Sequence, residues 1–470
     1  MKAVSLIPLV CLLSACVSTP PLPKVADQTY ASGGDARTLP EASGVTQTLT
    51  AGAALARWWT AFGSPQIDAL VDAALAANPD LKAQDAALTA ARQTYAAQAS
   101  SLWPQASAGY TVVRAQNANS LSNPLGSANP PSLYTLHTAQ LGVGYTVDLW
   151  GAGRQGLKVA KYQTDAVAFQ AQAARQALIA NVVSAAIGAA VLADQVKVAD
   201  RAADDSEKLV VYAQRQKALG NIGDVDLANA VNLAALDRQA AIGLRHALFV
   251  QLSLLRSLTG AGPAAPVGVP ASLADITLPA DLPMVLPVEV VDRRPDIRYA
   301  AAQFDAAAAS VRAAAAARLP VISLDGIAGG ASTQLASLFT QGNGFWSLGV
   351  GVVQPLTGAV GLYHQQKAAE AQLQAAQAQY QSTVQAALLG IANTLDALYA
   401  DGRSTAAADR QAQTTAELLS DQARQSQLGQ SGDADVVAAD RAAAQALGVQ
   451  SLARSQRYTD TVALFLAMGS

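Results

Sequence analysis

The chain has 470 residues and a formal net charge of −3, so it lacks the basic balance expected of a protein that binds nucleic acid. Hydrophobic residues make up 51% of the chain, yet aromatic residues make up only 5% and charged residues 14%. Alanine supplies much of this apolar content. Because alanine has the highest helix propensity and little bulk, the composition predicts helices packed closely along their length. The length allows two or three ordinary domains.

Residues 1–16 are expected to be a bacterial targeting segment and not part of the fold. Lys2 supplies a positive charge, and the apolar stretch after it is too short to span a bilayer as a helix. The segment ends in Leu-Ser-Ala-Cys, which is similar to a lipobox, so we expect Cys16 to carry the lipid. The alternative is an ordinary secretory signal in which Cys16 is incidental. Residues 17–77 then form a proline-containing tether and an N-terminal segment.

The remaining chain repeats one layout twice, over residues 78–260 and 294–470, with a proline-rich linker at 261–293 that is expected to run over a surface. Each half opens with a helix that starts at a Pro-Asp pair and stops at a second proline. The corresponding prolines lie 216 residues apart, as Pro79 and Pro295 at the start and Pro104 and Pro320 at the end.

Four segments that follow these first helices alternate between apolar and smaller or more polar residues, which predicts strands with one apolar face. They are 107–114, 140–150, 321–330 and 345–355, joined in pairs by polar loops at 116–132 and 331–344. The clearest apolar positions are Leu141, Val143, Tyr145, Val147 and Leu149, and Trp346, Leu348, Val350 and Val352. The alternate face carries Gly142, Gly144, Gly349 and Gly351, which is compatible with a water-filled lumen.

Each strand pair is followed by a proline-free helical pattern, at 154–219 and at 362–428. At 1.5 Å per residue each helix would be roughly 100 Å long, which is typical of a coiled coil or another extended assembly. Both helices end in a similar Leu-Gly-x-x-Gly-Asp turn, after which the chain returns as helix toward Gly260 and Gly469. The two turns lie 209 residues apart. The sequence therefore predicts two long helical hairpins.

Four strands are too few to close a barrel within one chain. Left open, they would expose two edges and an apolar face, which favours aggregation. A barrel shared by several chains resolves this, and no segment after the targeting region is expected to be a transmembrane helix, so strands would cross the membrane. Two chains would supply eight strands and three would supply twelve. Because about eight strands leave an interior just filled by side chains, a conducting pore favours the trimer.

The chain resembles the TolC-like outer membrane efflux proteins, and among them the NodT-like lipoprotein branch. The resemblance covers nearly the whole mature chain and rests on Cys16, the duplicated layout, the paired hairpin turns, and two strings. These strings are Arg-Arg-Pro-Asp-Ile-Arg at 293–298 and Asp-Leu-Trp-Gly at 148–151. One departure is Thr357, where an aromatic residue is expected after Pro-Leu.

The resemblance implies a mainly helical fold with a membrane β-barrel portion. In this arrangement a homotrimeric, twelve-stranded barrel crosses the outer membrane and continues into a long α-helical barrel in the periplasm. The implied function is the exit duct of a tripartite pump for drugs or other small molecules. The implied partners are a periplasmic adaptor and an inner-membrane resistance-nodulation-division pump, with no cofactor and no catalysis. The alternatives are a conduit for secreted polypeptides and a lipid-anchored periplasmic coiled-coil scaffold without a channel.

Two acids directly follow each turn, Asp224 and Asp226 after the first and Asp433 and Asp435 after the second. One reading is helix capping, since a carboxylate at a helix N-terminus accepts backbone N–H bonds. The other reading places them in a ring that narrows the periplasmic mouth and favours cations. The resemblance puts the second turn on the inner side, so the gate is assigned to Asp433 and Asp435. Arg424, one turn earlier, is either a solvated charge or a link to these carboxylates, across the hairpin or between neighbouring chains.

The turns themselves are the expected contact with the adaptor. Their glycines permit positive φ and close approach of a partner's backbone. The residues assigned to this contact are Arg215, Leu219, Gly220, Gly223, Asp224 and Asp226 at the first turn, and Leu428, Gly429 and Gly432 at the second.

Residues 151–156 match G-x-G-x-x-G between a predicted strand and a helix, the setting of a dinucleotide-binding loop. That motif requires a return to a strand within about 30 residues, whereas here the helix runs on to Leu219. We therefore interpret these glycines as a flexible joint. His137, His246 and His364 are too dispersed to suggest a metal site, and the sequence holds no C-x-x-C motif.

Overall fold

The computed structural model describes residues 20–21, 38–41, 44–51, 56–116, 133–284, 290, 292–356 and 358–469. The predicted targeting segment with Cys16, much of the tether, the loop after Gln116 and Thr357 lie outside these residues. The chain divides into two compact units, which are described separately. Unit 1 contains residues 88–167 and 300–380, and unit 2 contains residues 24–87, 168–299 and 381–470.

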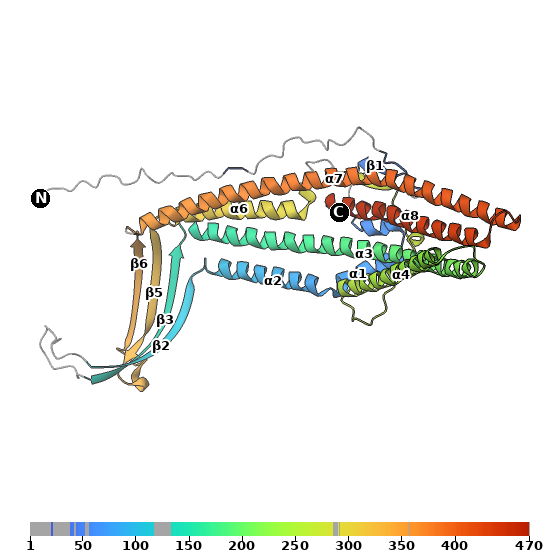
Figure 1. Ribbon diagram of the computed structural model, residues 1–470. Coiled ribbons are helices and arrows are strands. Elements are labelled where there is room, and N and C mark those ends of the chain that lie inside the picture. The colour runs from blue at the N-terminus through green and yellow to red at the C-terminus, as the bar shows by residue number, and fades with distance from the viewer. Residues whose placement is uncertain are drawn as a thin grey trace. The chain divides into compact units, whose positions relative to one another are not determined.

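Unit 1 holds a four-stranded sheet in the order β2-β3-β5-β6, and every neighbouring pair is antiparallel. The strands are β2 (Gln105–Gln116), β3 (Leu133–Val147), β5 (Val321–Ser332) and β6 (Gly344–Val353). Figure 1 shows them side by side, with the helices of this unit leaving from one end of the sheet. Among the described residues neither β2 nor β6 pairs with a further strand, so both edges of the sheet are open.

The alternation expected from the sequence is confirmed by the strand register. Trp346 pairs with Ala328, which in turn pairs with Leu141, so these three residues lie on one face of the sheet. Leu348 and Val350 lie on the same face as Trp346, because alternate residues of a strand point to the same side. Leu149 was wrongly assigned to this face, because β3 ends at Val147 and the chain turns there; β3 also starts seven residues earlier than expected, at Leu133. Asp148 stabilises this turn, because its carboxylate accepts hydrogen bonds from the backbone of Gly153 and Arg154 and so caps the next helix.

The helices that adjoin the sheet are the C-terminal part of α2 (Pro79–Ser100), the N-terminal part of α3 (Ala152–Ala218), most of α6 (Pro295–Ala316), and the N-terminal part of α7 (Ala359–Gln427). In unit 1, α6 and α7 meet in a small core. Its buried members are Phe304, Ala308 and Val311 from α6, and Ala369 and Leu373 from α7. Three of these five lie at helical spacing on α6, as one buried helix face requires.

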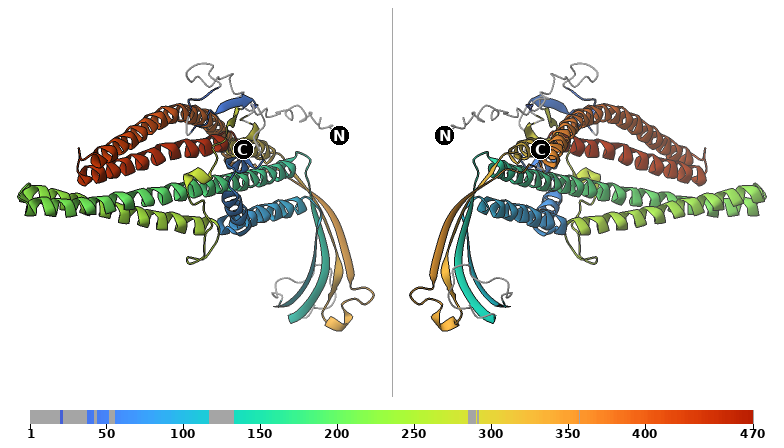
Figure 2. Two further views of the ribbon diagram at one scale, coloured as in Figure 1. Left: turned by 90° about the vertical axis from the view of Figure 1, so that its right-hand side faces the viewer. Right: turned by 90° about the vertical axis from the view of Figure 1, so that its left-hand side faces the viewer.

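Unit 2 contains the two helical hairpins, α3 with α4 (Asp224–Leu258) and α7 with α8 (Asp433–Ala467). The long helices have 67 and 69 residues and the return helices 35 each, which confirms the internal repeat. Figure 2 shows the turns of both hairpins at the same end of this unit. The other elements of unit 2 are short: β1 (Thr48–Ala51), η1 (Trp58–Phe62), α1 (Pro65–Ala77), η2 (Leu273–Asp275) and β4 (Asp281–Met284).

The expectation of an unpacked linker at 261–293 is wrong for its described part. Strand β4 pairs in parallel with β1, and Leu273, Leu278 and Leu282 are buried. The prolines break the helical pattern without preventing these leucines from packing on unit 2.

The sequence was expected to hold no later segment long and apolar enough to span a membrane as a helix, and this expectation is also wrong. Helix α3 contains an 18-residue window that is long and apolar enough, and 61% of that window is buried within the chain. The burial explains the composition, because Val182, Val183 and Ile187 of α3 are fully buried in unit 2. The helix therefore packs as an interior element.

A buried charge lies in unit 2 where α7, α8 and the N-terminal segment meet. The Arg457 guanidinium is fully buried and donates to Gln47 Oε1 at 2.5 Å, to the carbonyl oxygen of Leu398, and to that of Pro40 at 3.4 Å. These partners are neutral, so the compensating charge comes from the nearby carboxyls of Asp401 and Asp460. An uncompensated buried charge would be strongly destabilising.

Candidate functional site

The two hairpin turns share one backbone design. Gly220 has φ of 75° and Gly429 of 73°, a region that favours glycine because it has no Cβ. After each glycine, the next N–H closes a bond to a carbonyl five residues back: Asn221 N to Gln216 O at 2.9 Å, and Gln430 N to Gln425 O at 2.8 Å. This pattern satisfies the last carbonyls of α3 and α7 and ends both helices at equivalent residues.

The return helices also begin alike. Asp226 accepts the N–H of Gly223 at 3.0 Å, and Asp435 accepts the N–H of Gly432 at 3.0 Å. Each acid therefore satisfies a backbone donor that would otherwise be unpaired at the helix start, and its charge complements the helix dipole. The capping reading holds for the second acid of each pair.

The first acid of each pair differs between the turns. Asp224 forms an ion pair with Lys217, and its hydrogen bond with that lysine lowers the pKa of the Asp224 carboxyl. Asp433 instead accepts a hydrogen bond from the hydroxyl of Ser426 at 3.1 Å. Among the described residues, the first acid of the second turn therefore contacts a neutral partner and not a base.

Among the described residues, Arg424 pairs with Asp421 one turn earlier on α7, and no contact within the hairpin joins it to the acids of the second turn. At the first turn, no ion pair or hydrogen bond within the described chain joins Arg215 to Asp224 or Asp226. Both arginines sit on the long helices beside the turns, and exposed pairs of this kind contribute only about 0–1 kcal/mol.

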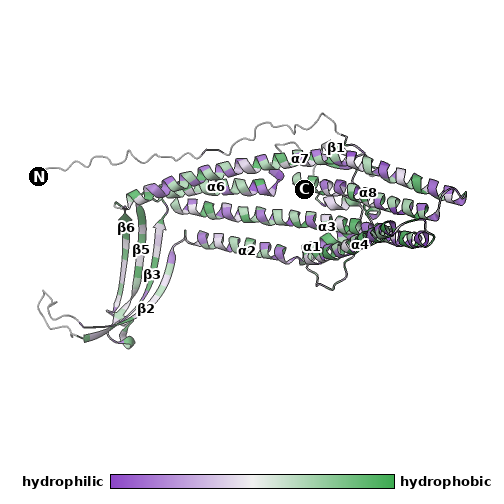
Figure 3. Ribbon diagram, viewed as in Figure 1, coloured by the Kyte–Doolittle hydropathy of each residue, from purple (hydrophilic) through white to green (hydrophobic). Residues whose placement is uncertain are grey.

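The turns expose matching apolar tips. Leu219 and Leu428 are each 73% exposed, and both precede the turn glycine. Figure 3 shows hydrophilic residues around both hairpin ends. A leucine at the same place in both repeats, surrounded by polar groups, is a surface suited to a protein partner.

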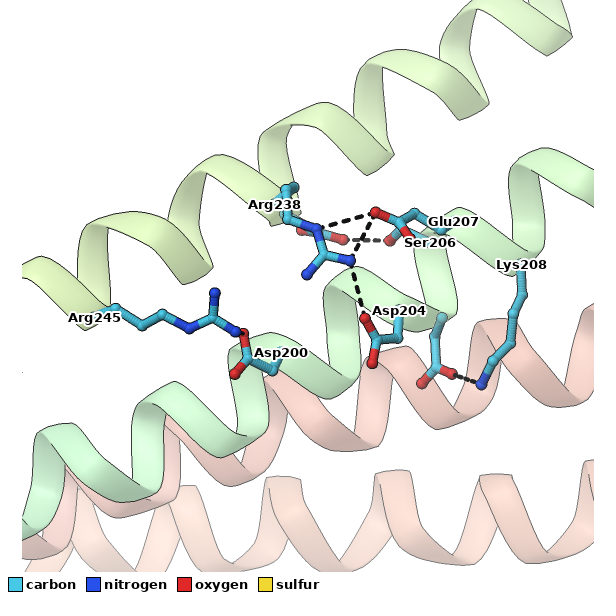
Figure 4. A network of polar contacts seen from close by, with 9 residues as sticks. Asp200, Asp204, Ser206, Glu207, Lys208, Arg238 and Arg245 are labelled. Atoms are coloured by element: carbon cyan, nitrogen blue, oxygen red, sulfur yellow. Dashed lines mark hydrogen bonds and ion pairs between the residues drawn. The ribbon is translucent and has the colours of Figure 1, made fainter.

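Below the first turn, ion pairs join the two arms of the hairpin. Arg238 of α4 donates to Glu207 at 2.7 Å and to Asp204 at 3.0 Å, and Arg245 of α4 donates to Asp200 at 2.7 Å (Figure 4). These α3 acids come at the spacing of one helix face. These ion pairs hold α3 and α4 at a fixed position relative to each other near the first turn.

A second set of contacts joins the two hairpins. Arg441 of α8 donates to both carboxylate oxygens of Asp237 on α4, at 2.6 and 3.0 Å, and to Ser206 of α3 at 2.9 Å. Arg441 and Asp237 are mostly buried, so solvent screens this pair less than the exposed ones. Sequence reasoning missed this pair, because residues 204 positions apart carry no local signal.

The string at 293–298 also has a structural role. Arg294 donates to both oxygens of Asp296 and to the carbonyl of Ala467 at 2.8 Å, at the end of α8. Arg298 lies over the ring of Phe169 on α3, 4.2 Å from its centroid. These contacts join the start of α6 to α8 and to α3. Within the described residues, no group of three or more His, Cys, Asp or Glu side chains could hold a metal ion.

Comparisons with known proteins agree with this architecture. The model of the outer membrane efflux protein family matches residues 70–261 and 286–470, most of the chain. The pyoverdine export outer membrane protein OpmQ of Pseudomonas putida is 25% identical over 415 residues, covering 88% of this chain and 87% of OpmQ. The toluene efflux pump outer membrane protein TtgC of Pseudomonas putida is 29% identical over 356 residues, covering 75% of this chain and 72% of TtgC.

Among solved structures, the outer membrane protein VceC of Vibrio cholerae is similar with a TM-score of 0.78 and 24% identity, covering 89% of this chain and 99% of VceC. The expected fold class, mainly helical with a strand portion and an internal twofold repeat, is confirmed by this likeness and by the structure itself. The chain therefore belongs to the outer membrane efflux protein family, and it is an outer-membrane efflux channel.

Proposed function

We infer that this chain works as a homotrimer whose twelve strands close one barrel across the outer membrane. The observation that carries the proposal is the open four-stranded sheet with one continuous apolar face. In hydrocarbon every backbone donor and acceptor needs a partner, so an isolated sheet with free edges cannot span the bilayer. Pairing β6 of one copy with β2 of the next removes both edges at once.

The hairpin ends are the docking surface for a periplasmic adaptor, and through it for an inner-membrane pump. Support comes from the matching exposure of Leu219 and Leu428 and from the positive φ shared by Gly220 and Gly429. A partner that recognises one turn would find the same shape at the other. The contact set is the one expected from sequence: Arg215, Leu219, Gly220, Gly223, Asp224, Asp226, Leu428, Gly429 and Gly432.

The periplasmic gate is assigned to Asp433 and Asp435, with Arg424 as a neighbouring charge. Asp433 supports this role best, because it accepts a hydrogen bond from the Ser426 hydroxyl and no base among the described residues pairs with it. Asp435 caps the start of α8 by accepting the N–H of Gly432, and it contributes its negative charge from that position.

The transported solutes are small molecules. This proposal draws on relatives named for pyoverdine export and toluene efflux. A lipid on Cys16 would anchor the N-terminus in the membrane, as the Leu-Ser-Ala-Cys sequence favours.

The test has two parts. The purified protein should run as a trimer and pass ions in planar bilayers. Expression in a strain lacking its own outer-membrane channels should restore resistance to small toxic compounds only when a matching adaptor and pump are present. A protein that stays monomeric and non-conducting in native-like lipid would favour the scaffold alternative. Export of a polypeptide without small-molecule resistance would favour the secretion alternative.

A further inference from the structure

The two faces of the sheet in unit 1 have different chemistry, and the register states which residues share a face. One cross-strand row reads Ala106, Val143, Gly326 and Leu348. The adjacent row reads Gln105, Gly144, Asp325 and Gly349. Because successive residues of a strand point to opposite faces, the first row belongs to the apolar face and the second to the face of small and polar residues.

Asp325 is the sole acid in the four strands β2, β3, β5 and β6, all of which lie within the described chain. Its cross-strand partners on both sides are glycines, Gly144 and Gly349. A Cβ added at Gly144 would lie 3.5 Å from Asp325 Oδ1, so the carboxylate leans over this glycine. Ser323, two residues earlier on the same face, donates a hydrogen bond to Asp325 Oδ2 at 3.1 Å.

The surroundings leave this carboxylate clear of bulky neighbours on its own row. Asp325 is exposed, and two glycines and a short serine surround it. The opposite face carries Trp346, Leu348 and Val350, which are 70–79% exposed in the single chain and need an apolar environment. Lipid therefore covers that face, and Asp325 points into the water-filled lumen, where a charge avoids the cost of entering hydrocarbon.

We propose that Asp325 is a specificity-determining residue of the channel: one carboxylate per chain, inside the barrel, that favours cationic over anionic solutes independently of the acids at the hairpin turns. The proposal rests on the proposed assembly of several copies into one barrel. Charges on a lumen wall act over about one Debye length, about 8 Å at 0.15 M salt and about 30 Å at 0.01 M. The preference should therefore grow as the salt concentration falls.

The experiment measures reversal potentials across planar bilayers under a KCl gradient at low salt. It uses the full protein with Asp433→Ala and Asp435→Ala, so that the turn acids do not mask the barrel. In this background Asp325→Asn should lower the ratio of potassium to chloride permeability several-fold while channels still open. Adding Gly349→Asp should restore the ratio, because it places a carboxylate on the neighbouring position of the same row, where the nearest atom to an added Cβ is 3.9 Å away.

Two outcomes would overturn the proposal while leaving the channel function standing. One is an unchanged permeability ratio in Asp325→Asn. The other is a fall in the ratio that Gly349→Asp fails to restore, which would trace the effect to local structure and not to lumen charge. A parent protein that conducts no ions at all would instead overturn the proposed assembly, and this inference with it.

Discussion

At the first hairpin turn Lys217 neutralises Asp224, whereas the equivalent residue 209 positions later is Ser426, which leaves Asp433 charged. The two turns share the backbone bonds that end the long helix and the acid that caps the return helix. The repeat therefore conserves the shape of the turn and changes its charge. A shape present twice suits a common partner, while a charge kept at one turn suits a task that only that turn performs.

The same comparison extends to the bases of the hairpins. Where the second hairpin has Asp401, Arg457 and Asp460, the first has Leu192, Leu248 and Gln251 at the equivalent positions. Gln251 donates to the carbonyl of Ala185 at 3.0 Å, an ordinary neutral contact. The second hairpin thus has buried ionisable groups at positions where the first hairpin has neutral residues. At these positions, only the stability of the second hairpin should therefore depend on pH.

The largest effect is expected from the shared shape. Replacing Gly220 or Gly429 with valine forces a β-branched residue to positive φ, at a cost of about 1–3 kcal/mol, and covers the turn with bulk. Drug resistance should be lost while trimers still form, as measured by growth on a toxic substrate and by native gel migration. Gly243→Val is the control, because Gly243 lies in α4 with no positive φ and no atom within 4 Å of an added Cβ. Full resistance with both turns altered would refute the adaptor assignment.

The next effect should separate the turns. The pair Asp433→Ala with Asp435→Ala is expected to raise single-channel conductance and weaken cation selectivity, because it removes the charge proposed to narrow the mouth. The matched pair Asp224→Ala with Asp226→Ala removes the same groups from the first turn, where Lys217 already balances one of them. Equal changes in bilayer conductance for the two pairs would show that the difference between the turns has no bearing on gating.

A smaller effect should follow from exchanging the residue that contacts the first acid of each turn. Ser426→Lys gives Asp433 a basic neighbour like the one Asp224 has, so cation selectivity should fall with little change in stability. Lys217→Ser makes the reverse exchange and should leave selectivity nearly unchanged if the gate belongs to the second turn. Reversal potentials at low salt measure both variants, because solvent screens exposed charges at high salt. A larger response to Lys217→Ser would move the gate to the first turn.

The smallest effect concerns the base of the second hairpin. Burial, with repulsion from Asp460, raises the pKa of Asp401 to about 7. The pKa of Asp401 is near 4 in the unfolded chain, so between about pH 4 and pH 7 the folded protein binds more protons than the unfolded one. The free energy of unfolding should therefore fall as pH rises through this window, by at most about 1.4 kcal/mol per pH unit for one proton, and level off above it.

Asp401→Asn should flatten that dependence, as measured by denaturant unfolding of the full protein between pH 5 and 8. Asp72→Asn serves as the control, because Asp72 is an exposed acid paired with Arg57. If the free energy of unfolding of wild type and of Asp401→Asn falls in parallel over this range, protonation of Asp401 does not contribute to the pH dependence of stability.

Much of the fold was predictable because it follows local rules. The helix ends at Ala218 and Gln427 depend on a glycine and a few neighbouring hydrogen bonds, all readable from one short string. The strand faces follow from alternation, although the start of β3 at Leu133 was missed because its first residues, Leu-Tyr-Thr-Leu-His, are not clearly alternating. The capping roles of Asp226 and Asp435 were foreseen as one of two readings, whereas the contacts of Asp224 and Asp433 were not.

By itself the sequence determined the internal repeat, the long hairpins, their turns and the family, since each depends on residue spacing along one chain. Only the tertiary structure decided which distant groups meet. It placed Arg441 on Asp237, buried Arg457 near Asp401 and Asp460, packed the linker against β1, and set Asp325 between two glycines. Such contacts depend on how whole elements pack, and helix and strand periodicity carries information about faces but not about which face meets which partner.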